Sequence, residues 1–191
     1  MSAQTPTYIM AVPWDLDRVR QTKALRAQTE ATVVWDQKHD AMDTWMRMLE
    51  TAGDGPGIFL EDDIRLTSNW REKIEAAIAE RPGDVIQFFS MRNDDLTIGS
   101  RYDAGRNFSM NQCYYLPEGG ARDLLEYAPS WLAEHPESPN AYDWVMRGWM
   151  QRDRRKYWIH VPSLVDHQAW PSVIDPRRSS GRKSKTFKEN A

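Results

Sequence analysis

Short runs of β-branched and aromatic residues alternate along this chain with longer charged segments that carry apolar residues at helical spacing. The short runs predict strands at 7–14, 31–35, 57–64, 84–90, 111–116 and 157–165. The longer segments predict helices at 15–27, 39–52, 68–81, 117–128 and 140–153, and the polar stretch 91–107 predicts a loop. Because strands alternate with helices, we expect one α/β domain with a mainly parallel central sheet flanked by helices.

The composition agrees with a single domain. The chain has 191 residues, of which 40% are hydrophobic, enough to bury a core without disulfides. Its single cysteine, Cys113, excludes an internal disulfide and a multi-cysteine zinc site. No apolar run approaches the roughly 18 residues of a membrane span. Residues 1–10 lack the pattern of a secretion signal. We therefore expect a cytoplasmic protein, in the host cytoplasm if a phage encodes it.

The formal charge of −3 is divided unevenly along the chain. Residues 177–191 contain six basic residues and one acid, a charge of +5, so the other 176 residues carry −8. This tail has one large apolar residue, Phe187, and is predicted to be a disordered basic extension. Clustered Lys and Arg attract phosphate whatever the sequence, so the tail either binds a polyanion such as DNA or only increases solubility.

Three acids, Glu61, Asp62 and Asp63, follow directly after the apolar run 58–60. In an α/β sheet, ligands bind where strands end at their carboxyl edge. Side chains alternate along a strand, so Glu61 and Asp63 are expected to point one way and Asp62 the other. Crowded carboxylates repel, and Mg²⁺ or Mn²⁺ relieves that repulsion while binding phosphate oxygens. The alternative is that the three acids only cap and solvate a turn.

The segment LEDDI at 60–64 resembles the metal-binding DxD-type motif of glycosyltransferases with the GT-A fold. It is closest to the LEDD motif of the lipooligosaccharide and collagen galactosyltransferase family. The segments NQCYYLPEGGARDLL and HVPSLVDHQAWPSVID resemble a strand–helix unit and the closing segment of small phage-type members. The resemblance runs in order from Thr7 to Asp175 and implies a GT-A-like, Rossmann-like domain over 1–176. The chain is shorter than the larger members, so most acceptor-binding elaborations are missing.

The resemblance implies a nucleotide-sugar donor, most simply a UDP-sugar, and a divalent cation, Mn²⁺ or Mg²⁺. Asp63 would be the main metal ligand and His167 a third ligand, with Glu61 or Asp62 contacting the metal, its water or the ribose. Arg18 and Arg20 either reach the diphosphate or form a solvated helix face. The nucleotide is expected to contact the loop after the first predicted strand, the acid after the second predicted strand and the closing loop. In that order, the residues are Pro13, Trp14 and Asp15, then Asp36, then Trp170 and Ser172.

Asp143 is the candidate base that takes the acceptor proton, since it resembles the acid that opens the acceptor-side helix. Its alternative role is electrostatic: it lies in a first helical turn, four residues before Arg147. Asp94 and its neighbour Asp95, in the predicted loop, are the other candidates for the base. Ser172 either holds a phosphate oxygen or serves a turn. The remaining histidines are expected to be structural or plain surface residues: His39, His135 and His160.

These features predict a metal-dependent glycosyltransferase. The leading acceptor is a hydroxymethylated pyrimidine in DNA, modified as in some bacteriophages, with the base flipped out and stacked on Trp or Tyr. A surface glycan or lipooligosaccharide is the alternative acceptor. A metal-dependent phospho- or nucleotidyltransferase is a second enzyme class, although the sequence has no Walker-type glycine loop. A non-catalytic nucleic-acid-binding module is a third possibility.

Overall fold

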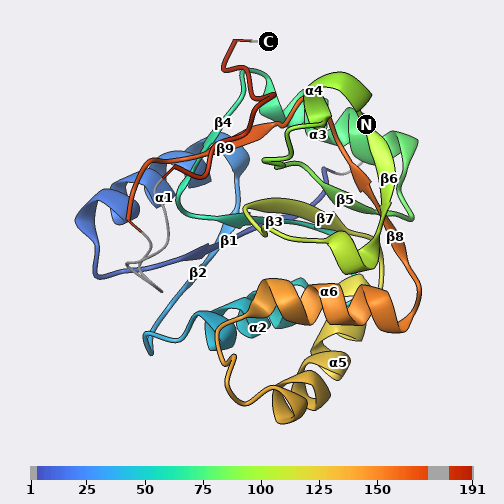
Figure 1. Cartoon of the computed structure of the whole chain (residues 1–191). Helices are drawn as coiled ribbons and strands as arrows, with labels where there is room; N and C mark the ends of the chain where they lie inside the picture. The colour runs from blue at the N-terminus through green and yellow to red at the C-terminus, as the bar shows by residue number, and fades with distance from the viewer. Residues whose placement is uncertain (1–3, 172–180, 191) are drawn as a thin grey trace.

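A seven-stranded mixed sheet forms the centre of the protein, in a computed structural model that describes residues 4–171 and 181–190 (Figure 1). The strand order is β2-β1-β3-β7-β5-β8-β6. Five strands run in the same direction, and β7 and β6 run opposite to them. The strands are β1 Thr7–Ala11, β2 Thr32–Trp35, β3 Gly57–Glu61, β5 Val85–Gln87, β6 Arg101–Ala104, β7 Cys113–Leu116 and β8 Lys156–Ile159. The predicted α/β class with a mainly parallel sheet is confirmed.

Helices cover both faces of this sheet. The helices are α1 Leu16–Thr29, α2 Ala41–Ala52, α3 Trp70–Glu80, α4 Asp95–Ile98, α5 Gly120–Glu134 and α6 Tyr142–Arg152, with a 3-10 turn η1 at Gly105–Asn107. Helices α2, α5 and α6 pack below the sheet in the view of Figure 1. Helices α1 and α3 contribute to a separate core on the opposite face. No helix within the described ranges is both long and apolar enough to cross a membrane.

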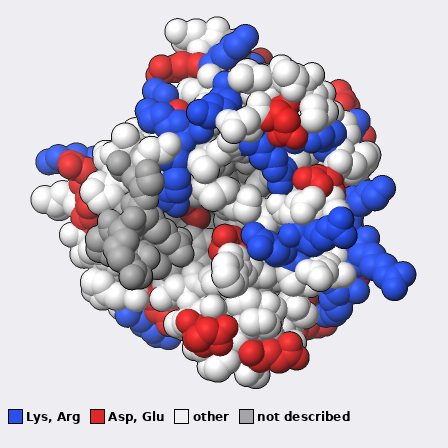
Figure 2. All heavy atoms as spheres, viewed as in Figure 1, with Lys and Arg blue, Asp and Glu red and all other residues white. Residues whose placement is uncertain are grey.

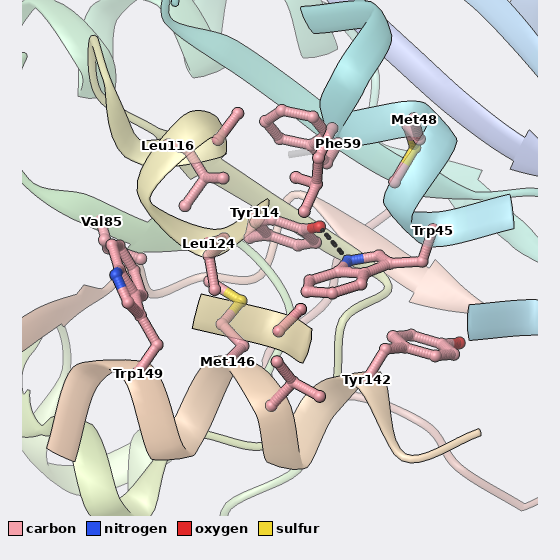
Figure 3. Packing of buried hydrophobic residues seen from close by; sticks show 14 of the residues in the cluster. Trp45, Met48, Phe59, Val85, Tyr114, Leu116, Leu124, Tyr142, Met146 and Trp149 are labelled. Carbon is pink, nitrogen blue, oxygen red and sulfur yellow. Dashed lines mark hydrogen bonds between the residues drawn. The ribbon is translucent and has the colours of Figure 1, made fainter. Parts of the chain in front are cut away.

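Alternation along the strands divides the apolar residues between the two cores. Tyr8, Phe59 and Tyr114 face α2, α5 and α6, whereas their neighbours Ile9 and Ile58 face the other layer. Figure 3 shows the first core, where Trp45 Nε1 donates a hydrogen bond to Tyr114 Oη at 2.9 Å. Four of the nine tryptophans are buried in the two cores: Trp45, Trp70, Trp131 and Trp149.

The predicted loop 91–107 contains regular structure instead. It forms α4, the edge strand β6 and η1. Because β6 pairs with β8 alone and its side chains are only partly buried, it has a polar sequence and lacks the apolar run of an internal strand. Two predicted strands are each divided where the chain leaves the sheet. Their outer parts, β4 Ile64–Leu66 and β9 Val165–His167, form a separate two-stranded ribbon.

The described part of the basic tail packs against this ribbon, which corrects the expectation of disorder for residues 181–190. Ser184 N donates to Asp166 Oδ1 at 2.8 Å, and Thr186 Oγ1 accepts from the backbone N–H of Ser163 at 3.1 Å. The guanidinium of Arg65 lies 5.0 Å from the centre of the Phe187 ring. Residues 184, 186 and 187 of this segment thus make contacts with the folded domain.

Candidate active site

A cleft of about 1030 Å³, including its open mouth, lies at the carboxyl ends of β1, β2 and β3. The N-terminal end of α6 closes it from the side. The residues just before β7 also reach it, because β7 runs antiparallel to β3 and therefore begins at the same edge of the sheet. This is the edge at which an α/β sheet binds ligands.

Seven of the residues predicted for the site line this cleft: Trp14, Arg18, Asp36, Glu61, Asp62, Asp63 and Asp143. Pro13 is exposed beside it, and Asp15 instead caps α1 by accepting hydrogen bonds from the backbone N–H groups of Asp17 and Arg18. Arg20 points to solvent and pairs with Asp17. Trp170 is partly buried but does not line the cleft, and Ser172 lies outside the described residues.

The alternative bases Asp94 and Asp95 lie away from the cleft. Both carboxylates pair with Arg101, at 3.2 and 2.8 Å. Asp95 is buried and Asp94 lines a separate surface depression. Asp143, in the first turn of α6, is therefore the candidate base that the structure brings to the cleft.

The guanidinium of Arg18 lies between two of the three acids. Its Nη1 donates to Asp62 Oδ1 at 2.5 Å and its Nη2 to Asp63 Oδ2 at 3.0 Å. All three side chains are almost fully buried. Asp62 Oδ2 also accepts the backbone N–H of Val12 at 2.9 Å. Burial nevertheless outweighs the Arg18 charge, and with the neighbouring Asp63 it raises the pKa of Asp62 to about 7.

Glu61 and Asp63 respond differently to burial. Burial and the charge of Asp63 raise the pKa of Glu61, although Tyr142 Oη donates to its Oε1 at 2.6 Å. Burial also acts to raise the pKa of Asp63, but His167 and Arg18 more than offset it and hold that pKa below its usual value. His167 Nε2 lies 3.2 Å from Asp63 Oδ2 and is fully buried behind it. The pKa values of these neighbouring acids are thus shifted in opposite directions.

The predicted metal ligands Asp63, Glu61 and His167 do not assemble into a three-ligand site. Within residues 4–171 and 181–190, no group of three or more His, Cys, Asp or Glu side chains is arranged to hold a metal ion. The physical reason is that Arg18 and His167 share one oxygen of Asp63, while Glu61 accepts hydrogen bonds from Tyr142 and from Gln112 Nε2. Asp63 Oδ1 is buried and has no hydrogen-bond partner among the described residues.

Several polar groups in the cleft were not predicted from the sequence. Asn111 and Gln112 are buried, and both polar atoms of Asn111 and Oε1 of Gln112 lack partners within the described part of the chain. Asn140 Oδ1 is similarly unpaired. Such groups are costly unless a water or a ligand satisfies them. In the sequence, the pair Asn111–Gln112 stands directly before an apolar strand. That position indicates cleft residues only if β7 is known to be antiparallel and therefore to begin at the cleft edge of the sheet.

An aromatic pair lies at the mouth of the cleft. The rings of Trp14 and His39 stack with centroids 3.7 Å apart and an angle of 21° between their planes. Trp14 is 40% exposed, and both residues line the cleft. His39 is exposed, as expected of a surface residue, and it also lines the cleft, which was not expected. Nearby, the buried Asp36 accepts the backbone N–H groups of Lys38 and Asp40, which fixes its carboxylate.

No family model matches the sequence, and no curated protein matches it. Solved structures match at the level of the fold. A197 from STIV has a TM-score of 0.52 and 16% identity, with 98% of this chain and 97% of that chain covered. The CTP:phosphocholine cytidylyltransferase LicC of Streptococcus pneumoniae has a TM-score of 0.50 and 7% identity, covering 86% and 93%. A glycosyltransferase involved in the glycosylation of the major capsid of PBCV-1 has a TM-score of 0.42 and 10% identity, covering 82% and 93%. The chain has a GT-A-like α/β fold, and these similarities concern the fold alone.

Proposed function

We propose that this protein transfers a sugar from a nucleotide-sugar donor to an acceptor hydroxyl. The observation that carries the proposal is the composition of the cleft, which combines three kinds of group in one place. The stacked pair Trp14 and His39 offers an aromatic surface for a nucleobase. Arg18 and Arg182 supply positive charge. Unpaired buried amides offer donors and acceptors to a neutral, hydroxyl-rich group.

Each part has a role in glycosyl transfer. Asp36 lies close to the stacked pair, in the position from which a carboxylate can accept a hydrogen bond from a base or ribose. Arg182 extends from the packed tail to the cleft, where a guanidinium suits a diphosphate. Asn111, Gln112 and Asn140 would bind the sugar hydroxyls. Asp143 would accept the proton of the attacking hydroxyl, as general base catalysis requires.

The positive charge for the departing diphosphate comes, in this proposal, from the two guanidinium groups. The predicted three-ligand set for Mn²⁺ or Mg²⁺ does not form, so no step is assigned to a metal. Asp63 Oδ1 is the one carboxylate oxygen of that set without a described partner. A thermal-shift titration of Mn²⁺ with wild type and with Asp63→Asn tests whether that oxygen binds a cation.

A direct test uses isothermal titration calorimetry with UDP, UDP-glucose and UDP-galactose, followed by measurement of UDP release in the presence of acceptor. We expect a nucleotide sugar to bind more tightly than UDP alone, because only the sugar satisfies the amides. Asn111→Ala should weaken nucleotide-sugar binding by about tenfold, equivalent to about 1.4 kcal/mol, and leave UDP binding unchanged. Absence of binding by all three nucleotides would contradict the proposal.

A nucleotidyltransferase is the second candidate, favoured by the fold similarity to a cytidylyltransferase. Such an enzyme would use a nucleoside triphosphate and release pyrophosphate instead of UDP. Incubation with CTP and the other nucleoside triphosphates, with pyrophosphate as the readout, separates the two activities.

For the acceptor of the glycosyltransferase we propose a hydroxymethylated pyrimidine in DNA. Transfer of radiolabelled sugar to hydroxymethyl-containing DNA tests it, with unmodified DNA of the same sequence as the control.

A further inference from the structure

A second surface, outside the cleft, carries a concentration of guanidinium groups. A shallow depression is lined by four arginines, which we call the arginine surface: Arg92, Arg101, Arg106 and Arg147. We propose that the arginine surface binds the phosphate backbone of a nucleic acid strand and places one of its bases at the cleft. Binding of a nucleic acid at this surface does not depend on the proposed function. The inference that the bound strand is the sugar acceptor rests on the proposed function.

The charges of this surface are only partly neutralised within the protein. Its lining contains the four arginines and two acids, Asp94 and Asp103, a balance of +2. Arg101 pairs with Asp94 and with the buried Asp95, and Arg92 Nη1 lies 3.4 Å from Asp103. With Asp95 counted, the balance is +1. Arg106 and Arg147 form no ion pair with any described carboxylate. The domain as a whole is acidic, so this local excess of positive charge is a specific feature of the surface.

Exposed aromatic side chains flank the arginines. Trp144 and Tyr102 are each 49% exposed, and the Arg147 guanidinium lies 5.8 Å from the centre of the Trp144 ring. Tyr102 packs edge-on against Trp158 at 4.9 Å, which fixes its ring while leaving one side in solvent. Guanidinium groups interleaved with exposed aromatic rings are what single-stranded nucleic acids require, because phosphates pair with the former and bases stack on the latter.

The arginine surface adjoins the cleft through two continuous segments. In α6, Asp143 lines the cleft and Arg147, one turn later, lines the depression. Before β7, Met110 lines the cleft and Ser109 the depression. Figure 2 shows Lys and Arg side chains gathered over the part of this face where Figure 1 places β6 and the C-terminal end of α6. A strand bound there would therefore lie beside the cleft that Asp143 lines.

The basic tail is the competing location for a nucleic acid. Its lysines Lys183, Lys185 and Lys188 are exposed, but the segment that carries them is packed against the β4–β9 ribbon, and none of the three lines the arginine surface. The two locations therefore predict different mutational results.

Fluorescence anisotropy with a labelled single-stranded 20-mer, measured across a range of salt concentrations, tests the proposal. The double variant Arg106→Ala/Arg147→Ala should bind at least tenfold more weakly. The slope of log K against log salt concentration should become shallower by about 1.4 in this variant, because it loses two phosphate contacts and each contact on a single strand contributes about 0.7 to the slope. The matched control Lys23→Ala/Arg26→Ala removes the same charge from exposed positions on α1 and should leave binding unchanged. The single variant Arg106→Glu, at an exposed position, repeats the test without disturbing the Arg147 contacts.

Three results would overturn the proposal. The first is that the wild-type protein does not bind the 20-mer, or that the double variant Arg106→Ala/Arg147→Ala binds it as tightly as wild type does. The second is that only Lys183→Ala/Lys185→Ala/Lys188→Ala weakens binding, which would place the strand on the tail. The third is competition by inorganic polyphosphate as effective as competition by unlabelled DNA, which would remove any role for the aromatic rings. Nucleotide-sugar binding by wild type is measured separately, so failure here and failure of the proposed function are distinguishable.

Discussion

Removal of the Arg18 guanidinium should destabilise the fold far more than removal of a surface arginine from the same helix. Arg18 is buried and donates to Asp62 and Asp63, so Arg18→Met leaves two buried carboxylates without their cation while preserving most of the apolar stem. Loss of one partner from a buried ion pair costs about 3–5 kcal/mol. Two lost hydrogen bonds to charged groups, at about 1.5–3 kcal/mol each, give a similar range.

Arg20 provides the matched control. It lies on the same helix and pairs with Asp17 at 2.9 Å, but its side chain is 77% exposed. Exposed ion pairs contribute about 0–1 kcal/mol, so Arg20→Met should be close to neutral. Arg18→Lys should fall between the two, because an ammonium keeps the charge but lacks the planar fork that reaches both carboxylates.

Urea unfolding followed by tryptophan fluorescence gives the free energy of unfolding of each variant, and the slope with denaturant checks that the unfolding transition is unchanged. A loss for Arg18→Met that is no larger than the loss for Arg20→Met would refute the reasoning. That result would mean that the acids are satisfied without the guanidinium, for example by taking up protons.

Three further predictions concern stability. Gly105→Ala should cost about 1–3 kcal/mol in urea unfolding, because the new Cβ would collide with the Met150 side chain, whereas Gly83→Ala, with open space around it among the described residues, should be tolerated. Tyr114→Phe should cost about 1–3 kcal/mol by leaving buried Trp45 Nε1 without an acceptor; an unchanged midpoint would show that another acceptor replaces it. Burial lowers the pKa of His160, so the unfolded chain binds this proton more readily and stability should fall as the pH drops below about 6.5. His160→Gln should show a smaller loss of unfolding free energy between pH 7.5 and 5, and an identical pH dependence would exclude His160 as the source.

The position of the site was predictable from the sequence because it depends on a local pattern. An apolar run that ends in Glu61, Asp62 and Asp63 indicates a strand end, and parallel strands bring Trp14 and Asp36 to the same edge. The partners of these acids were not predictable. Whether a buried carboxylate pairs with a metal, a guanidinium or a phenol depends on contacts between elements that are far apart in sequence, such as the one between Tyr142 and Glu61.

Strand direction limited the prediction in the same way. The residues before β7 reach the cleft only because β7 is antiparallel to β3, and an apolar run has no signature of its direction. The edge strand β6 was missed because its side chains are half-exposed and polar. The sequence also did not show which tryptophans belong to the core and which to the site. Trp45 and Trp149 are buried in the core, and of the two tryptophans predicted for the site, Trp14 lines the cleft and Trp170 does not.

Three adjacent acids in a cleft that we propose for an anionic donor pose an electrostatic problem, and the directions of their pKa shifts lessen it. If Glu61, Asp62 and Asp63 were all ionised, they would outnumber Arg18 and Arg182 and repel a diphosphate. Burial raises the pKa of Glu61 and raises that of Asp62 to about 7, and both shifts favour the uncharged form of the carboxyl group. Asp63, whose pKa is lowered, remains ionised and holds Arg18 in place. The shifts thus reduce the negative charge that these three acids present beside Arg182, while Asp63 positions Arg18. Asp36 and Asp143 also line the cleft and add negative charge to it.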